Sequence, residues 1–174
     1  MDLSESKIYV GTYAKYNDGS IFGKWLTLSD YADKDEFYEA CKELHKDEED
    51  PELMFQDWED IPDAMVGECF ISEKWWELYD EVGDDEDEAD KVIAYFENCC
   101  SGNFLEQDMT LLVRDAQDQF VCKEEDWDDY VEDRISEYLA QFDGFNRSYF
   151  DDEYYKAELE DDYTIADGYV FKNY

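Results

Sequence analysis

Residues 7–28 have the sequence KIYVGTYAKYNDGSIFGKWLTL, which is typical of two strands joined by a turn. The run from 7 to 15 is rich in the branched and aromatic residues that favour strands, and the run from 22 to 28 has the same character. Between the two runs, Asn17-Asp18-Gly19-Ser20 supplies residues that favour a turn. The sequence therefore predicts a β-hairpin at the start of the fold.

The residues that follow the hairpin complete an expected N-terminal subdomain. Phe37, Ala40, Cys41 and Leu44 have the i, i+3, i+4, i+7 spacing of an amphipathic helix, which we expect over residues 33–46. A short strand near 53–58 would join the hairpin in one sheet. We therefore expect an α+β subdomain over residues 1–60.

The middle of the chain has a helical pattern and forms an expected second subdomain over residues 61–105. Ser72 is a suitable N-cap for a helix through Trp75 and Trp76, and Gly83 would end that helix. A second helix is predicted from the apolar residues Ala89, Val92, Ile93 and Phe96, which share one face.

The last part of the chain, residues 106–174, is expected to form a third, α+β subdomain. Its predicted elements are strands at 109–113 and 119–123, a long helix at 126–142, a short helix at 152–159 and a final hairpin formed by 163–165 and 169–172. The long helix has an apolar stripe made of Trp127, Val131, Ile135, Tyr138, Leu139 and Phe142. The expected fold class is thus α+β, in three small subdomains.

The chain is strongly acidic, with 51 Asp and Glu against 14 Lys and Arg and a formal net charge of −37. Residues 1–46 have a net charge of only −3, whereas residues 47–90 have −19 and residues 91–174 have −15. Acidic chains that stay disordered are usually poor in aromatic residues. Because this chain is 18% aromatic, we expect a folded protein with a charged surface.

This charge argues against direct binding to nucleic acid or to anionic membranes and favours a basic partner, of which nucleic-acid-binding proteins are the largest class. Carboxylates at i, i+3 and i+4 repeat about every 5 Å along a helix, so two such rows approach the charge density of a DNA duplex. The helix at 126–142 lacks compensating basic residues, which favours such mimicry over an ordinary solvated face. A halophilic protein, whose acidic surface binds water and salt, is the other interpretation of the composition.

The candidate DNA-mimic surface consists of acidic residues from the middle and last parts of the chain. They are Asp57, Glu59, Asp60, Asp80, Glu81, Asp84, Asp85, Glu86, Asp87, Glu88, Glu125, Asp128, Asp129, Glu132, Asp133, Asp151, Asp152 and Glu153.

The sequence offers little that is typical of an enzyme. It contains one histidine, His45, and none of the common nucleophile, phosphate-loop, dinucleotide or zinc-protease motifs. The acidic run at 84–88 lacks the glycine of an EF-hand loop, so we expect no metal site and no cofactor. Five cysteines without a CxxC pair or a signal peptide indicate reduced thiols in a cytoplasmic protein, and no apolar stretch approaches the roughly 20 residues of a membrane span.

Several motifs resemble those of the ArdA antirestriction proteins. The segment Ile8-Tyr9-Val10-Gly11-Thr12-Tyr13, followed by Tyr16-Asn17, Gly19, Gly23 and Trp25, is similar to that family's opening hairpin. Gln56-Asp57-Trp58-Glu59, the late acidic stretch from Tyr149 to Glu160 and Gly168-Tyr169-Val170-Phe171 resemble further parts of the family. One departure is Ala157-Glu158, where the family usually has an Arg-Asp pair.

The resemblance implies an elongated, curved homodimer whose acids imitate the phosphates of bent DNA. It implies a non-enzymatic inhibitor that occupies the DNA-binding groove of a type I restriction-modification enzyme, in its methyltransferase/specificity core, and that a mobile genetic element uses in a bacterial host cell. We expect apolar residues exposed near Phe120, Cys122 and Trp127 to form the dimer contact. The alternative is an acidic interaction module or inhibitor for another basic nucleic-acid-binding protein, such as a nucleoid protein or a CRISPR effector.

Overall fold

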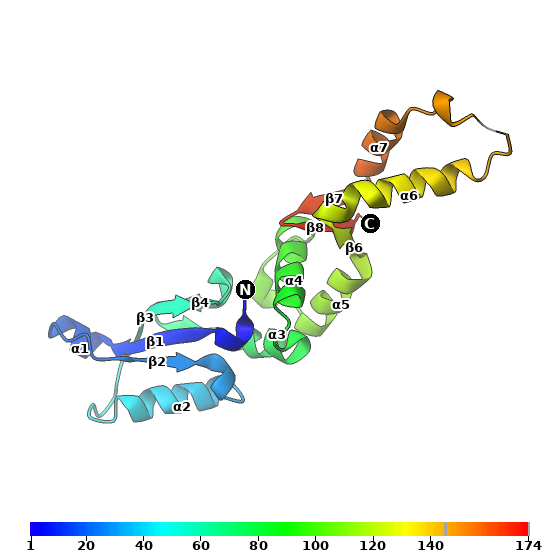
Figure 1. Ribbon diagram of the computed structural model, residues 1–174. Helices are drawn as coiled ribbons and strands as arrows, with labels where there is room; N and C mark the ends of the chain where they lie inside the picture. The colour runs from blue at the N-terminus through cyan, green and yellow to red at the C-terminus, as the bar shows by residue number, and fades with distance from the viewer. Residues whose placement is uncertain (145, 174) are drawn as a thin grey trace. The chain divides into compact units, whose positions relative to one another are not determined.

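The computed structural model describes residues 1–144 and 146–173 (Figure 1). By their contacts these residues divide into two units. Unit 1 contains Met1–Asp90 and Gly102–Val113, and unit 2 contains Lys91–Ser101 and the described residues from Arg114 onward. The sequence-based division at residues 60 and 105 into three subdomains stays a prediction.

Unit 1 is built on a three-stranded antiparallel sheet with the strand order β2-β1-β3. The predicted hairpin and the predicted third strand are therefore confirmed. Ile8 and Val10 of the central strand are fully buried, as expected for alternate residues on the core face of a strand. The strands are β1 (Lys7–Thr12), β2 (Lys24–Thr27) and β3 (Leu53–Glu59).

The first strand is shorter than predicted, because residues Tyr13–Asn17 form the short helix α1. The hydroxyl of Thr12 accepts a hydrogen bond of 3.3 Å from the backbone N–H of Lys15, which satisfies a donor of the first helical turn. Of the predicted turn residues, Asn17 ends this helix and Asp18-Gly19-Ser20 follow it, and Gly19 adopts a φ of 78° that favours glycine.

Helix α2 (Lys34–Leu44) confirms the amphipathic helix expected at 33–46. Asp33 caps it by accepting a 2.8 Å hydrogen bond from the N–H of Glu36. Phe37 and Cys41 are fully buried, and the Phe37 ring lies 5.9 Å from that of Phe55 on the sheet. Burial raises the pKa of the Cys41 thiol to about 12, so this cysteine stays protonated.

The middle of the chain contains the two predicted helices, α3 (Lys74–Val82) and α4 (Glu86–Cys99). The Ser72 hydroxyl accepts a 3.2 Å hydrogen bond from the N–H of Lys74, and Gly83, with a φ of 60°, ends α3 as expected. The sequence analysis did not predict the small hairpin before them, made of β4 (Val66–Gly67) and β5 (Phe70–Ile71).

The predicted strand at 109–113 is wrong, because these residues begin helix α5 (Met109–Gln119). The buried residues Met109, Leu112, Val113 and Ala116 have helical spacing. The Asp108 carboxylate accepts a 3.1 Å hydrogen bond from the N–H of Leu111 at the start of this helix. A short apolar run is compatible with either a strand or a helix. The spacing of the buried residues from Met109 to Ala116 indicates the helix.

Unit 2 has a second three-stranded antiparallel sheet, with the order β6-β8-β7. The predicted strand at 119–123, the long and short helices and the final hairpin are confirmed. Trp127, Val131, Ile135 and Val170 form a core in this unit. The elements are β6 (Phe120–Lys123), α6 (Trp127–Leu139), α7 (Asp152–Glu160), β7 (Tyr163–Ala166) and β8 (Tyr169–Lys172).

Short 3-10 helices link these elements, at Leu3–Glu5, Leu28–Asp30, Asp63–Met65, Phe104–Glu106, Glu124–Asp126 and Arg147–Tyr149. Helix α6 ends at Leu139, before the predicted limit, and Tyr138 and Phe142 at the end of the predicted stripe are exposed. No helix in the part of the chain that the structure describes is both long and apolar enough to cross a membrane.

Candidate functional site

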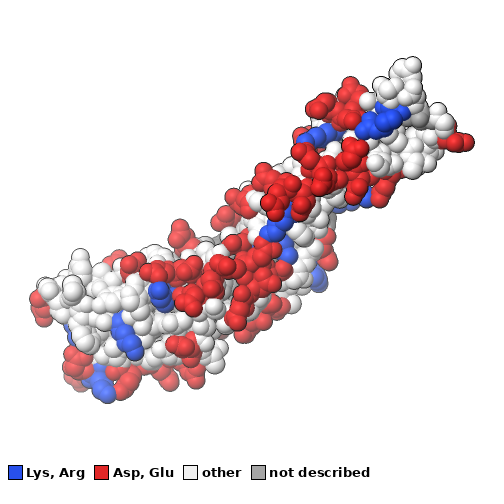
Figure 2. Space-filling model, viewed as in Figure 1, with Lys and Arg blue, Asp and Glu red and all other residues white. Residues whose placement is uncertain are grey.

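Carboxylates cover much of the molecular face shown in Figure 2, where they gather over helices α3 and α4 and over helix α6. None of the eighteen acids expected to form the candidate surface is buried. Sixteen of them are exposed, and Glu88 and Asp152 are half-buried. The structure therefore leaves this whole set accessible to a partner.

In unit 1 the candidate acids lie at the end of β3, at the end of α3, in the link to α4 and in the first turn of α4. Glu59 pairs with Lys7 at 2.7 Å, so its charge is partly compensated. Asp85 accepts a 3.1 Å hydrogen bond from the N–H of Glu88, and Asp84 accepts one of 2.8 Å from the hydroxyl of Tyr79. The acids in the first turn of α4 also stabilise the N-terminus of this helix, where the helix dipole favours negative charge.

The end of α3 borders an open cavity of about 460 Å³ in unit 1. Asp80 and Glu81 line it, and Glu81 accepts a 2.6 Å hydrogen bond from the Thr110 hydroxyl. Three further acids line this cavity and are not among the predicted surface residues: Glu77, Glu106 and Asp108. Glu106 and Asp108 lie in a sequence segment far from α3, so no local pattern connects them with it. Across residues 1–144 and 146–173, no group of three or more His, Cys, Asp or Glu side chains is arranged to hold a metal ion.

In unit 2 the acids of α6 lie on the side of the helix opposite its buried stripe. Two of them are paired with basic residues from other elements: Asp128 with Lys156, and Glu132 with Arg147 at 3.7 Å. Arg147 also donates a 2.7 Å hydrogen bond to Asp152. These contacts raise the pKa of Lys156 through its hydrogen bond to Asp128, and the hydrogen bond from Arg147 lowers the pKa of Asp152.

The expectation that α6 lacks compensating basic residues therefore needs correction. Among the described residues, Glu125, Asp129 and Asp133 are exposed and form no ion pair; we call these three the open carboxylates. Asp128, Glu132 and Asp152 have cations beside them. Lys156 and Arg147 reach Asp128 and Glu132 from outside α6, whereas Arg147 lies only five residues before Asp152. The open carboxylates therefore present uncompensated charge on this part of unit 2.

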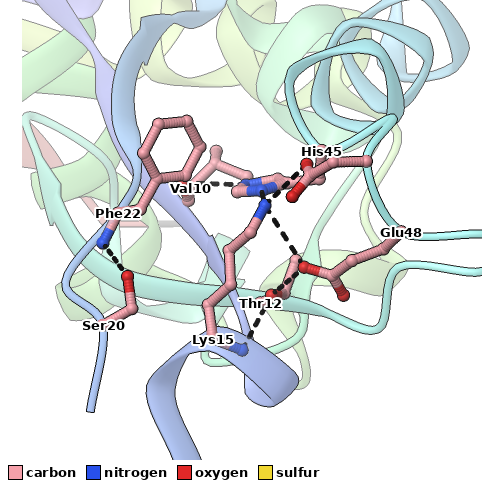
Figure 3. A network of polar contacts seen from close by, with 8 residues as sticks. Val10, Thr12, Lys15, Ser20, Phe22, His45 and Glu48 are labelled. Atoms are coloured by element: carbon pink, nitrogen blue, oxygen red, sulfur yellow. Dashed lines mark hydrogen bonds and ion pairs between the residues drawn. The ribbon is translucent and has the colours of Figure 1, made fainter. Parts of the chain in front are cut away.

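His45, the one histidine of the chain, is fully buried at the end of α2 (Figure 3). The Lys15 ammonium donates to His45 Nδ1 at 2.9 Å, and His45 Nε2–H donates to the Val10 carbonyl at 3.3 Å. Glu48 lies 3.3 Å from the same ammonium and accepts a 2.7 Å hydrogen bond from Thr12. Burial and the nearby Lys15 charge lower the pKa of His45. This network ties α1 and α2 to the sheet.

The residues suggested for a dimer contact are less exposed than expected. Trp127 is only 5% exposed and belongs to the core of unit 2, with its ring 5.1 Å from that of Tyr163. Phe120 and Cys122 are half-buried, and the Phe120 ring packs against Tyr169 at 6.2 Å. The expectation that Trp127 is exposed is therefore wrong, because its side chain packs in the core of unit 2.

Two comparisons with known proteins concern the family of the chain. Residues 8–171 match the family model of the antirestriction protein ArdA. No curated protein matches the chain significantly. The match extends over both units, from the first strand of unit 1 to the last strand of unit 2.

Proposed function

Because the chain belongs to the ArdA family of antirestriction proteins, we propose that it inhibits type I restriction-modification enzymes by occupying the DNA-binding groove of their methyltransferase/specificity core. The observation that supports this mechanism is the accessibility of the acids: 42 of the 51 lie in residues 47–174, and the candidate set among them is exposed or half-exposed.

The spacing of the acids on α6 supports mimicry of a phosphate backbone. Asp128, Asp129, Glu132 and Asp133 lie close together on this helix, whose axis rises by about 1.5 Å per residue. The six residues 128–133 occupy about 9 Å of axis and carry four acids, or one acid per about 2.3 Å, which approaches the one charge per about 1.7 Å of a DNA duplex. Two of these four acids are ion-paired, so the open carboxylates are the ones best able to meet basic residues of the groove.

The proposed mimic surface comprises the eighteen candidate acids: those at the end of β3, in α3, in the α3–α4 link, in the first turn of α4, in and just before α6, and at the start of α7. They offer charge but no base edges, so inhibition should not depend on the DNA sequence that the enzyme recognises. In this proposal the protein works as a homodimer without catalysis or a cofactor, in the cytoplasm of a bacterial host, and serves a mobile genetic element.

Competition with DNA tests this function. The protein is added to a type I methyltransferase core bound to labelled DNA, and the released DNA is measured by gel shift at low and moderate salt. We expect displacement at low salt with the protein in excess. The affinities of the protein and of DNA for the core both fall as salt rises, so the protein's affinity is calculated at each salt from the DNA affinity measured at the same salt. Absence of displacement at low salt, with the protein in excess, would refute the proposal.

An acidic surface also fits other basic grooves, so a pull-down from host lysate provides a second test. Recovery of the restriction-modification subunits supports the proposal. Recovery of nucleoid proteins or CRISPR effectors without those subunits would favour the alternative of a more general acidic interaction module.

A further inference from the structure

The basic side chains of this protein lie on aromatic rings unusually often. At least seven of them, in the part of the chain that is described, lie within 6 Å of a ring centre: Lys7, Lys15, Lys34, Lys91, Lys123, Arg134 and Arg147. Significant cation–π pairs occur about once per 70–80 residues in proteins, which would give two or three in a chain of this length. Aromatic faces are therefore a common place for a cation in this protein.

Arg147 in unit 2 shows the most complete arrangement. Its guanidinium carbon lies 5.5 Å from the centre of the Phe150 ring. The same group donates a 2.7 Å hydrogen bond to Asp152 and lies 3.7 Å from Glu132. The guanidinium thus has an aromatic face on one side and carboxylates around it, a combination that suits arginine better than lysine because the planar group stacks and donates at once.

Arg134 repeats this arrangement on the same helix as Glu132. It lies 5.3 Å from the Tyr130 ring and 2.7 Å from Glu137. Two arginines of unit 2 are therefore held by a ring together with at least one carboxylate. This pairing is a local property of the surface formed by α6, α7 and the segment between them.

Two rings of the same unit remain largely open to solvent. Tyr149 is 81% exposed and Tyr154 is 62% exposed, and no cation of the described residues lies over either ring. The Tyr154 hydroxyl donates a 2.5 Å hydrogen bond to Glu158, and its backbone N–H donates to Asp151 at 3.0 Å. Tyr154 therefore has one carboxylate at its hydroxyl and another at its backbone N–H.

We propose that Tyr149 and Tyr154, with the carboxylates of Asp151 and Glu158, bind arginine side chains of the basic partner. The pairing of Arg147 with Phe150 and Asp152 shows the chemistry that such an arginine would meet. This inference rests on the proposed function, because it assigns the part of the partner that these rings contact. A phosphate backbone has no aromatic face, so the rings add a preference for arginine over lysine that charge mimicry alone lacks.

The test replaces each ring in the full chain without changing its charge. Tyr149→Leu and Tyr154→Leu are compared with Tyr154→Phe, which keeps the ring and loses only the hydroxyl. Tyr16→Leu is the matched control, because Tyr16 is 56% exposed but lies in the weakly charged residues 1–46. Circular dichroism checks that every variant is folded.

The first measurement is displacement of labelled DNA from the methyltransferase core. We expect each of the two leucine variants in unit 2 to lose affinity about two- to five-fold, the effect of an exposed cation–π contact. Tyr154→Phe and Tyr16→Leu should bind as the unchanged protein does. Equal affinities for all four variants would overturn the inference while leaving the proposed function intact, whereas failure of the unchanged protein to displace DNA would overturn both.

The second measurement compares binding of a ten-residue arginine peptide with that of a ten-residue lysine peptide by calorimetry. Their charges are equal, so a surface that acts through charge alone binds them equally. We expect tighter binding of the arginine peptide, and loss of this preference in the Tyr149→Leu/Tyr154→Leu double variant. A preference that is absent, or that persists without the two rings, would overturn the inference.

Discussion

The open carboxylates provide the sharpest test of where the decoy charge acts. The variant Glu125→Gln/Asp129→Asn/Asp133→Asn removes three exposed, unpaired charges from unit 2. Each phosphate-like contact contributes about 0.9 to the slope of log K against log[salt]. If all three acids contact the partner as phosphates do, the slope should fall by about 2.7. At 0.1 M salt this would weaken binding by up to about 500-fold, if the salt-independent part of the affinity is unchanged.

The assay is displacement of labelled DNA from a methyltransferase core at four salt concentrations. The matched control is Asp18→Asn/Asp35→Asn/Glu39→Gln, which changes the net charge equally but acts on exposed acids of residues 1–46. A second control, Asp128→Asn/Lys156→Gln, removes a paired acid together with its cation and leaves the net charge unchanged. The control in residues 1–46 should bind within about two-fold of the unchanged protein, because contacts between exposed charges are local at about 0.1 M salt. The Asp128→Asn/Lys156→Gln variant should lose less affinity than the unit 2 variant, because Lys156 already compensates this acid.

Equal losses in the unit 2 variant and in the Asp18 control would mean that total charge, rather than its position on α6, sets the affinity. That result would refute the reasoning from the open carboxylates. An unchanged salt slope in the unit 2 variant would refute it as well.

Three further predictions concern stability. Trp127→Ala should lower the free energy of unfolding by about 3–5 kcal/mol, because the side chain is 5% exposed in the core of unit 2; urea denaturation measures this, and a change below about 1 kcal/mol would contradict the packing. The pKa of His45 is lowered in the folded protein, so its contribution to stability is present above about pH 6.5 and is lost as pH falls through the folded pKa. Between pH 7.5 and 5.5 the melting temperature should therefore fall more steeply for the unchanged protein than for His45→Gln. Parallel curves of melting temperature against pH would contradict this prediction. Finally, a rise from 0.02 to 0.3 M NaCl should raise the melting temperature by several degrees, since salt screens the repulsion among 51 acids; a flat dependence would show that the acids repel one another little.

Local spacing predicted the amphipathic helices well. Phe37 and Cys41 in α2, and Trp127, Val131 and Ile135 in α6, are buried as their 3.6-residue periodicity indicated. The same principle explains the one wrong strand. The run at 109–113 is too short to show a period, and the helical spacing appears only when Ala116 is included.

Other features could not be predicted because they depend on contacts between distant residues. Strands of two residues, such as β4 and β5, have no pattern of their own and form through pairing with each other. The exposure of the acids followed from their chemistry. The ion pairs that compensate some of these acids could not be predicted in this way. Lys156 lies 28 residues from the Asp128 carboxylate that it contacts, so no local sequence pattern contains both residues.

The interleaved order of the two units also limits how this gene can be cut or recombined. Unit 1 takes Met1–Asp90 and Gly102–Val113, and unit 2 takes the stretch between them, so no single breakpoint separates the two. A fragment that ends at Val113 keeps Tyr95 but loses Phe171, whose ring lies 5.3 Å away in unit 2. Such a fragment would expose apolar surface and be prone to aggregate. Recombination between related genes would therefore preserve folding only if both segments of a unit were exchanged together. This favours inheritance of the whole coding sequence as one block.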